Sequence, residues 1–246
     1  MDRSAPTRRR LVVAVVTAAV AIVVWRQFAA EALPPATGGD PPELPAALAD
    51  AALVRRPGGA SPARVALLLH GAGSAPEKFL DVADQVVQNG FVALVVRGPI
   101  EEGPGRYTWS SPDETDALLR RVVELAGREM VLAPGRPILV GYSLGGTMAV
   151  ELLARHPDGY ASAFAISPGV LNRNPLLAAP GVRPLTILVG SNDAASERAV
   201  DAIERLWDDA HEPVWVVHHA GDHRPPEDWR ARFDDAMTWM SVKASS

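Results

Sequence analysis

The chain has 246 residues, of which 48% are hydrophobic, and a formal net charge of −5. This composition suits one sizeable globular domain rather than a disordered chain, and the lack of a basic stripe excludes nucleic acid as an expected partner. The chain contains no cysteine, which excludes disulfides, thiolate metal sites and a cysteine nucleophile.

A basic cluster followed by an apolar run stands at the beginning of the sequence. Three arginines, at positions 8 to 10, precede the run from Leu11 to Trp25, in which only Thr17 is polar. As a helix this run is shorter than the roughly 30 Å hydrocarbon core of a bilayer. The pattern predicts that residues 1–32 are either a cleaved signal peptide or a retained signal anchor. In both cases we expect export, with the following domain anchored to the membrane or released into the periplasmic or extracellular space.

Residues 33–45, "LPPATGGDPPELP", are rich in proline and glycine and show no hydrophobic period. Such a composition is typical of a linker that is semi-rigid where proline dominates. One folded domain is therefore predicted over residues 46–246.

Apolar runs that predict strands alternate along this domain with amphipathic stretches that predict helices. One helix start is marked by Ser111-Pro112-Asp113-Glu114, which combines a capping box with proline at the first helical position. The expected strands are 63–71, 91–96, 136–141, 160–167, 185–190 and 213–219, and the expected helices are 76–90, 111–125, 145–157, 196–210 and 227–240. This alternation predicts an α/β fold with a mostly parallel central sheet and helices on both faces. Ligands of such sheets bind at the carboxyl ends of the strands.

A serine follows the predicted central strand in Gly141-Tyr142-Ser143-Leu144-Gly145. A G-x-S-x-G sequence between a strand and a helix is typical of a strained turn that raises the serine hydroxyl above the sheet. The glycines on either side relieve the crowding, and the helix N-terminus favours the negative charge that develops in acyl transfer. Ser143 is therefore the predicted nucleophile.

A serine hydroxyl needs a base within hydrogen-bond reach, and six histidines compete for that role. His223 is preferred because it lies in the loop beyond the last strand, from which an imidazole can swing over the sheet edge. His219, which closes that strand, is the next candidate. His70 is expected to shape the glycine-rich loop after the first core strand.

The acid that orients the base is expected just beyond the strand 185–190, where Asp193 stands. Asp222 adjoins His223, but neighbouring residues rarely aim their side chains at each other, so Asp222 is expected to be a solvated loop carboxylate. An oxyanion needs two preorganised amide donors, and the backbone N–H groups of Ala72 and Leu144 are the predicted pair.

Four stretches together resemble a known family: "LLLHGAG", "GYSLGG", Gly190-x-x-Asp193 and Gly221-x-His223. The chain resembles an α/β-hydrolase, most closely the compact, lid-free phospholipase/carboxylesterase group of serine esterases. In that group the serine, aspartate and histidine of these motifs form the catalytic triad, which carries over to Ser143, Asp193 and His223. The resemblance implies hydrolysis of carboxylic esters or thioesters without a cofactor. Extracellular esterases of the polyhydroxybutyrate-depolymerase and feruloyl-esterase types are alternatives.

The segment between the strands 160–167 and 185–190 is too short for an inserted lid domain, so an open site for a small-molecule ester is expected. The expected substrate-binding residues are Gly71, Tyr107, Trp109, Tyr142, Val170 and Leu171. No cluster of carboxylates or histidines predicts a metal site. Two alternatives remain open: a non-catalytic, membrane-tethered hydrolase-like binding domain, and an acyltransferase on the same fold. The sequence does not indicate an oligomeric state.

Overall fold

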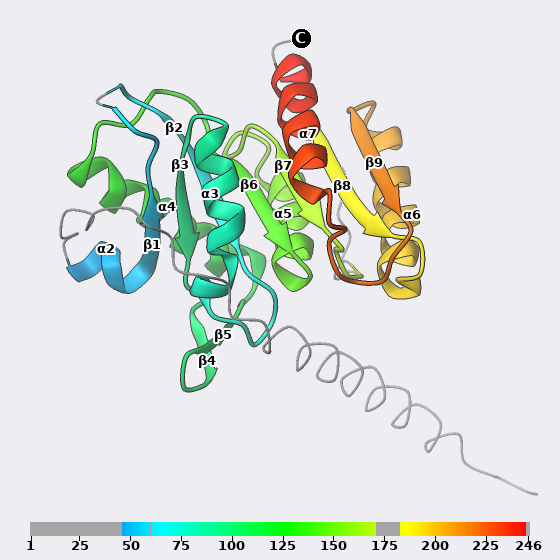
Figure 1. The fold of residues 1–246 in the computed structure, drawn as a ribbon, viewed down its shortest axis with the longest axis horizontal. Coiled ribbons are helices and arrows are strands. Elements are labelled where there is room, and N and C mark those ends of the chain that lie inside the picture. The colour runs from blue at the N-terminus through cyan, green and yellow to red at the C-terminus, as the bar shows by residue number, and fades with distance from the viewer. Residues whose placement is uncertain (1–45, 60, 171–182, 245–246) are drawn as a thin grey trace, which may run out of the picture. The chain divides into compact units, whose positions relative to one another are not determined.

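A seven-stranded sheet with the strand order β1-β3-β2-β6-β7-β8-β9 forms the centre of the computed structural model, which describes residues 46–59, 61–170 and 183–244. Neighbouring strands are parallel except that β1 runs antiparallel to β3. The strands are β1 (Ala52–Arg55), β2 (Arg64–Leu69), β3 (Phe91–Val96), β6 (Ile138–Tyr142), β7 (Ala163–Ile166), β8 (Leu185–Gly190) and β9 (Val214–His219). The carboxyl ends of the six parallel strands, β2, β3 and β6 to β9, lie along one edge of the sheet, which is the lower edge in Figure 1.

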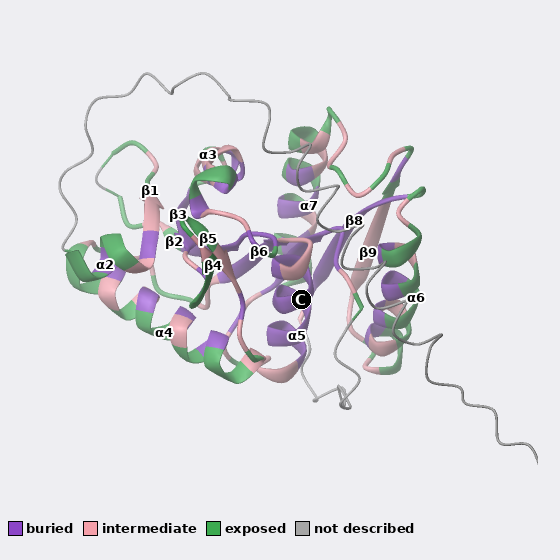
Figure 2. Cartoon of the chain, turned by 90° about the horizontal axis from the view of Figure 1, so that it is seen from below, coloured by how far each residue is buried: buried purple, intermediate pink, exposed green. Residues whose placement is uncertain are grey.

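Helices cover both faces of the sheet (Figures 1 and 2). The helices α4, α5 and α6 pack on one face, and α3 and α7 pack on the other. The helical elements are α2 (Ala46–Ala51), the 3-10 turn η1 (Pro76–Phe79), α3 (Leu80–Gln88), α4 (Pro112–Glu129), α5 (Leu144–Arg155), α6 (Ala194–Asp209) and α7 (Trp229–Lys243). A short antiparallel hairpin, β4 (Ile100–Gly103) with β5 (Arg106–Thr108), stands beside the carboxyl edge.

The strands are largely apolar because helices cover both faces of the sheet. In β2, Leu67 and Leu69 belong to the core under α4, α5 and α6, whereas Leu68 belongs to the core under α3 and α7. In the second core, Phe233 of α7 meets Phe164 of β7 edge to face, with 5.0 Å between the ring centroids. The side chains of alternate residues thus pack against the helices on opposite faces of the sheet.

The predicted mostly parallel sheet with helices on both faces is confirmed, and each expected strand and helix of the domain is present. Three elements were not predicted: α2, β1 and the β4–β5 hairpin. The strand β1 has four residues, too few to show a period, and β4 carries two adjacent glutamates. Sequence patterns of such elements do not differ from those of loops.

Several expectations fall outside the described residues. These are the signal segment 1–32, the linker 33–45, and most of the segment 168–184, on which the absence of a lid depends. In the part of the chain that the structure describes, no helix combines the length and the apolar character needed to cross a bilayer.

The start of α4 is fixed by the capping box that the sequence predicts. The Ser111 side chain accepts a hydrogen bond from the Glu114 N–H, and the Glu114 carboxylate accepts one from the Ser111 N–H. Pro112 occupies the first turn, where a backbone N–H would have no intrahelical partner. The missing N–H of proline therefore removes no hydrogen bond from the helix. Two otherwise unpaired backbone donors are thereby satisfied.

The substitution Ser111→Ala is expected to lower the free energy of unfolding by about 1 kcal/mol, because it removes the cap. Ser110→Ala is the matched control: the Ser110 hydroxyl is buried without a hydrogen-bond partner among the described residues, so its removal should cost little. Urea denaturation of the three proteins measures both effects. Equal stabilities of the two variants would contradict the assignment of the cap.

Candidate active site

Ser143 occupies a sharp turn between β6 and α5 with φ 54° and ψ −120°. A positive φ is strained for a residue other than glycine, and hydrogen bonds hold the turn on both sides. The Ser143 N–H donates to Ile166 O at 2.9 Å, and the Thr147 N–H donates to Ser143 O at 2.9 Å. The turn therefore presents the Ser143 side chain at the carboxyl edge of the sheet.

The glycines around this serine are required by close contacts between backbone segments. A Cβ atom on Gly141 would lie 2.1 Å from the carbonyl oxygen of Gly145, and a Cβ on Gly145 would lie 2.1 Å from that of Leu69. Such distances are far below van der Waals contact. The two glycines of the motif thus allow α5 to begin directly against the ends of β6 and β2.

The side chains of Ser143, His223 and Asp193 form a hydrogen-bonded chain. His223 Nε2 lies 3.0 Å from Ser143 Oγ, and His223 Nδ1 lies 2.5 Å from Asp193 Oδ2. A carboxylate accepts hydrogen bonds only, so Nδ1 carries the proton and Nε2 is left to accept one from the serine hydroxyl. The three residues come from the ends of β6, β8 and β9.

Asp193 is also the N-cap of α6, where its Oδ1 accepts the N–H of Ser196 at 3.2 Å. Its side chain is 8% exposed. Burial alone would raise the pKa of this carboxyl, but hydrogen bonds from His223 and Ser196, together with the charge of His223, outweigh it and lower the pKa to about 2. Asp193 is therefore ionised at neutral pH and accepts hydrogen bonds from both His223 and Ser196.

The two other candidates for the base and the acid lie outside this chain of hydrogen bonds. His219 is 6% exposed, and its ring nitrogens have no partner among the described residues. Asp222 is exposed and pairs with Arg224 at 3.2 Å, and the hydrogen bond from Arg224 lowers the pKa of its carboxyl. The structure thus brings together Ser143, Asp193 and His223, and neither alternative.

His70 fixes the loop that follows β2. Its Nε2 accepts the N–H of Gly98 at 3.1 Å, so Nδ1 carries the proton and donates to Gly71 O at 2.8 Å. Burial lowers the pKa of His70, which keeps the imidazole neutral. Trp109 Nε1 donates to His70 O at 2.8 Å. The sequence assigned a loop-shaping role to His70, and these contacts agree with it.

This loop runs beside the serine. A Cβ on Gly71 would lie 3.5 Å from the Cβ of Ser143 and 3.3 Å from Cδ1 of Tyr142. The predicted oxyanion donors, the N–H groups of Ala72 and Leu144, have no acceptor within the described part of the chain. Leu144 is the first residue of α5, where the N–H groups point away from the helix. Both amides are therefore available to a ligand.

The predicted substrate-binding residues fall into different environments. Trp109 is 5% exposed and packs against the His70 ring at a centroid distance of 5.0 Å, so it supports the loop from behind. Val170 is 61% exposed. Leu171 lies outside the described residues. The indole of Trp109 is thus enclosed by the core, and its assignment to the substrate site stays a prediction.

Two tyrosines remain, one near the loop after β2 and one beside His223. Tyr107 is half-buried on β5, stacks under the Arg97 guanidinium at 5.3 Å, and its N–H donates to Ser74 O at 2.8 Å. Tyr142 lies beside His223, with 5.3 Å between the ring centroids. Burial raises the pKa of Tyr142, so its hydroxyl keeps its proton and acts as a donor.

Sequence reasoning missed Ser167 and the β4–β5 hairpin as parts of the site. The Ser167 hydroxyl donates to the backbone oxygen of His223 at 3.1 Å, and Arg106 Nε donates to Gly73 O at 3.2 Å. Ser167 directly follows the strand β7, so the rule that sites lie at the carboxyl ends of strands was the available signal. No comparable signal marks Arg106.

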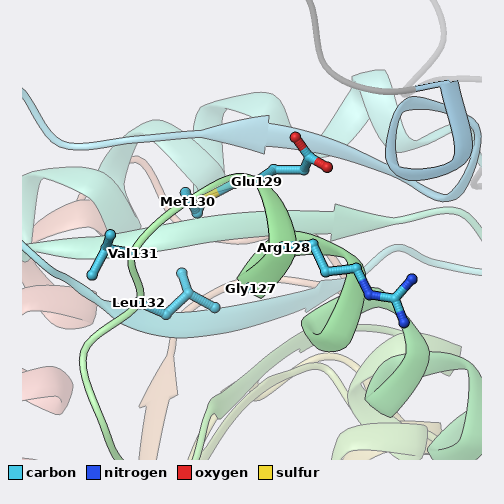
Figure 3. A pocket seen from close by; sticks show the side chains of 6 residues that line it. All are labelled: Gly127, Arg128, Glu129, Met130, Val131 and Leu132. Carbon is cyan, nitrogen blue, oxygen red and sulfur yellow. The ribbon is translucent and has the colours of Figure 1, made fainter.

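A separate hollow lies beside the end of α4 and is lined by residues 127–132 (Figure 3). Leu132 forms an isolated parallel β-bridge with Ala63, which directly precedes the first residue of β2. The hollow therefore lies at the amino edge of the sheet, opposite the edge that carries Ser143. The candidate active site is the one at the carboxyl edge, where Ser143, His223 and Asp193 are joined by hydrogen bonds.

Comparison with known proteins places this geometry in a family. Residues 78–243 match the family model described as "Putative esterase", which covers more than half of the chain. The chain belongs to this esterase family. Among curated proteins, the chain is 31% identical over 219 residues to the putative esterase NocK of Nocardia uniformis, covering 82% of this chain and 56% of NocK. It is 29% identical over 117 residues to the lipase LipV of Mycobacterium tuberculosis, covering 48% of this chain and 41% of LipV.

The chain thus spans about half the length of these curated relatives. Among solved structures, the carboxylesterase of Bacillus cereus superposes with a TM-score of 0.62 at 20% identity, covering 78% of this chain and 93% of that one. At this identity the likeness shows the fold, which is that of the α/β-hydrolases.

The substitution Gly145→Ala is expected to abolish the hydrogen-bonded arrangement at Ser143, because the added Cβ would lie 2.1 Å from Leu69 O. Gly127→Ala is the matched control in another helix: its Cβ would meet only Leu132 Cδ1, at an ordinary 3.8 Å. Alanine in that helix should raise the free energy of unfolding by about 0.5–1 kcal/mol.

Thermal unfolding and ester hydrolysis of both variants test this contrast. A Gly145→Ala enzyme with the stability and the rate of the wild type would contradict the close approach of α5 to β2.

Proposed function

We propose that this esterase hydrolyses carboxylic esters of small molecules through an acyl-enzyme intermediate on Ser143. The observation that carries the proposal is the chain of hydrogen bonds from Asp193 to His223 at 2.5 Å and from His223 to Ser143 at 3.0 Å, at a strained turn on the carboxyl edge of the sheet. Membership of the esterase family supports the same reaction class.

The geometry supports the following order of events. His223 Nε2 accepts the Ser143 proton while Oγ attacks the ester carbonyl carbon, and the carbonyl oxygen becomes an oxyanion. The N–H groups of Ala72 and Leu144 would donate to that oxygen. His223 then gives its proton to the departing alkoxide, and the acyl group remains on Ser143. In the second half of the reaction, His223 accepts a proton from a water molecule whose oxygen attacks the acyl carbon. The bond to Ser143 Oγ then breaks, His223 returns the proton to Oγ, and the acid is released.

Asp193 serves this cycle in two ways. Its carboxylate holds the imidazole in the tautomer that leaves Nε2 free to accept a proton, and its negative charge stabilises the imidazolium that forms in each half-reaction. With its pKa lowered to about 2, the carboxyl group stays ionised and does not compete for the serine proton.

A fluorophosphonate probe followed by mass spectrometry is expected to label Ser143 and to leave Ser143→Ala unlabelled. Ser143→Ala should lose hydrolysis of p-nitrophenyl acetate, whereas Asp193→Asn should keep the fold and lose about 10⁴-fold in rate, because the imidazole tautomer is no longer fixed. Asp222→Asn is the control for the acid and should stay near wild-type activity.

A larger loss in Asp222→Asn than in Asp193→Asn would show that the acid is wrongly assigned. The same assay with an added alcohol distinguishes hydrolysis from acyl transfer, because a transferase would form the new ester.

We further propose that residues 1–32 export the domain or anchor it to a membrane, with residues 33–45 as the tether. The arginine cluster and the apolar run up to Trp25 support this proposal. Residues 1–45 fused to a reporter enzyme should direct it to the membrane or beyond, and a variant with the three arginines at positions 8–10 replaced by glutamine is the control. A reporter that stays in the cytoplasm would overturn the proposal.

A further inference from the structure

Ser167 combines a buried hydroxyl with an unusual backbone. It follows the last residue of β7, its side chain is fully buried, and its φ is 45°. Its N–H donates to Leu188 O at 2.8 Å, which continues the pairing of β7 with β8. A positive φ costs a serine conformational energy that a glycine would not pay. Strain of this kind at a site edge points to a role for the side chain.

The partner of that hydroxyl is the backbone of the proposed base. Ser167 Oγ donates to the carbonyl oxygen of His223 at 3.1 Å. The same carbonyl accepts a second hydrogen bond, from the Tyr142 hydroxyl at 3.4 Å. Tyr142 and Ile166 are paired in the register of β6 and β7, so the two adjacent strands each direct one hydroxyl at a single carbonyl oxygen.

The loop that carries His223 needs these hydrogen bonds because it extends across the edge of the sheet. It leaves β9, and Ser143 follows β6, with β7 and β8 between them in the strand order. Over β8 the loop is close to the sheet: a Cβ on Gly190 would lie 2.0 Å from Asp222 O, and the Asn192 N–H donates to Gly221 O at 2.8 Å. The hydroxyls of Ser167 and Tyr142 secure its next residue over β7 and β6.

We propose that Ser167, assisted by Tyr142, is a positioning residue that holds the His223 backbone so that Nε2 stays within hydrogen-bond distance of Ser143 Oγ. Ser167 touches no reacting atom and acts only through His223. The proposal rests on the esterase function proposed above. It predicts that loss of the hydroxyl slows the chemical step, because small displacements of a catalytic group are costly, while ester binding is unchanged.

The test compares three substitutions that remove a hydroxyl. Ser167→Ala and Ser167→Gly both delete the donor, and Ser167→Gly also relieves the strain of the positive φ. Ser162→Ala is the matched control, since Ser162 is likewise buried and precedes the first residue of the same strand. We expect kcat for p-nitrophenyl acetate to fall about 10- to 100-fold in both Ser167 variants, with KM and the Ser162→Ala rate near those of the wild type.

A double-mutant cycle with Tyr142→Phe tests whether the two hydroxyls act on one carbonyl. Each single variant keeps one donor to His223 O, so the loss in Ser167→Ala/Tyr142→Phe should exceed the product of the two single losses. The downfield proton resonance of His223 Nδ1–H, which reports its hydrogen bond to Asp193, should broaden or shift in the Ser167 variants and not in Ser162→Ala. A role confined to folding would lower stability without moving this resonance.

The outcomes separate the two proposals. If the wild type neither hydrolyses the ester nor labels with a fluorophosphonate, the esterase function fails and the positioning role falls with it. If the wild type is active and the Ser167 variants match Ser162→Ala in kcat, only the positioning role is overturned. Should Ser167→Ala fail to fold, Ser167→Gly carries the comparison, and unchanged kcat in it overturns the proposal equally.

Discussion

The strained turn at Ser143 constrains how the neighbouring strands, helix and loop pack around it. With φ at 54°, the chain reverses from β6 into α5 within one residue, and the helix must begin against the ends of two strands. Gly141 and Gly145 make this possible, because a side chain at either would overlap a backbone carbonyl. The same close approach brings the loop after β2, with Gly71, beside the serine. The position of the amide donors is thus a consequence of how tightly α5 packs on the sheet.

The polar groups of the site are held in place by neighbouring residues that take no part in the proposed reaction. His70 links Gly71 to Gly98, and Trp109 holds the His70 carbonyl from the core. Because the His70 ring is neutral, it spans two backbone segments without placing a charge near the proposed oxyanion. Sites built on such locked supports keep their geometry without further cost when the substrate binds.

Much of the site could be predicted because its residues follow long apolar strands. Ser143, Asp193 and His223 stand just after β6, β8 and β9, and the parallel sheet brings those ends together. The choice of Asp193 over Asp222 followed from chain order and local geometry, and the structure agrees with it in its hydrogen bonds. The sequence could not show the direction in which each side chain points. Trp109 stands in a loop beside the site, yet its ring turns inward to the core.

The missed elements have a common physical origin: their roles depend on contacts between segments distant in sequence. Arg106 matters because β5 crosses the loop at Gly73, and Ser167 matters because a loop from β9 returns over β7. Neither contact leaves a periodic pattern in the sequence. Analysis of hydrophobic patterns therefore identifies only an exposed hairpin and the end of a strand. For Ser167, but not for Arg106, the backbone conformation is a distinguishing property. Ser143 and Ser167 both have a positive φ, and both lie where a strand of the parallel sheet ends at the site. Strain at these two serines therefore marks two of the points at which the end of the sheet meets His223, one at its imidazole and one at its backbone.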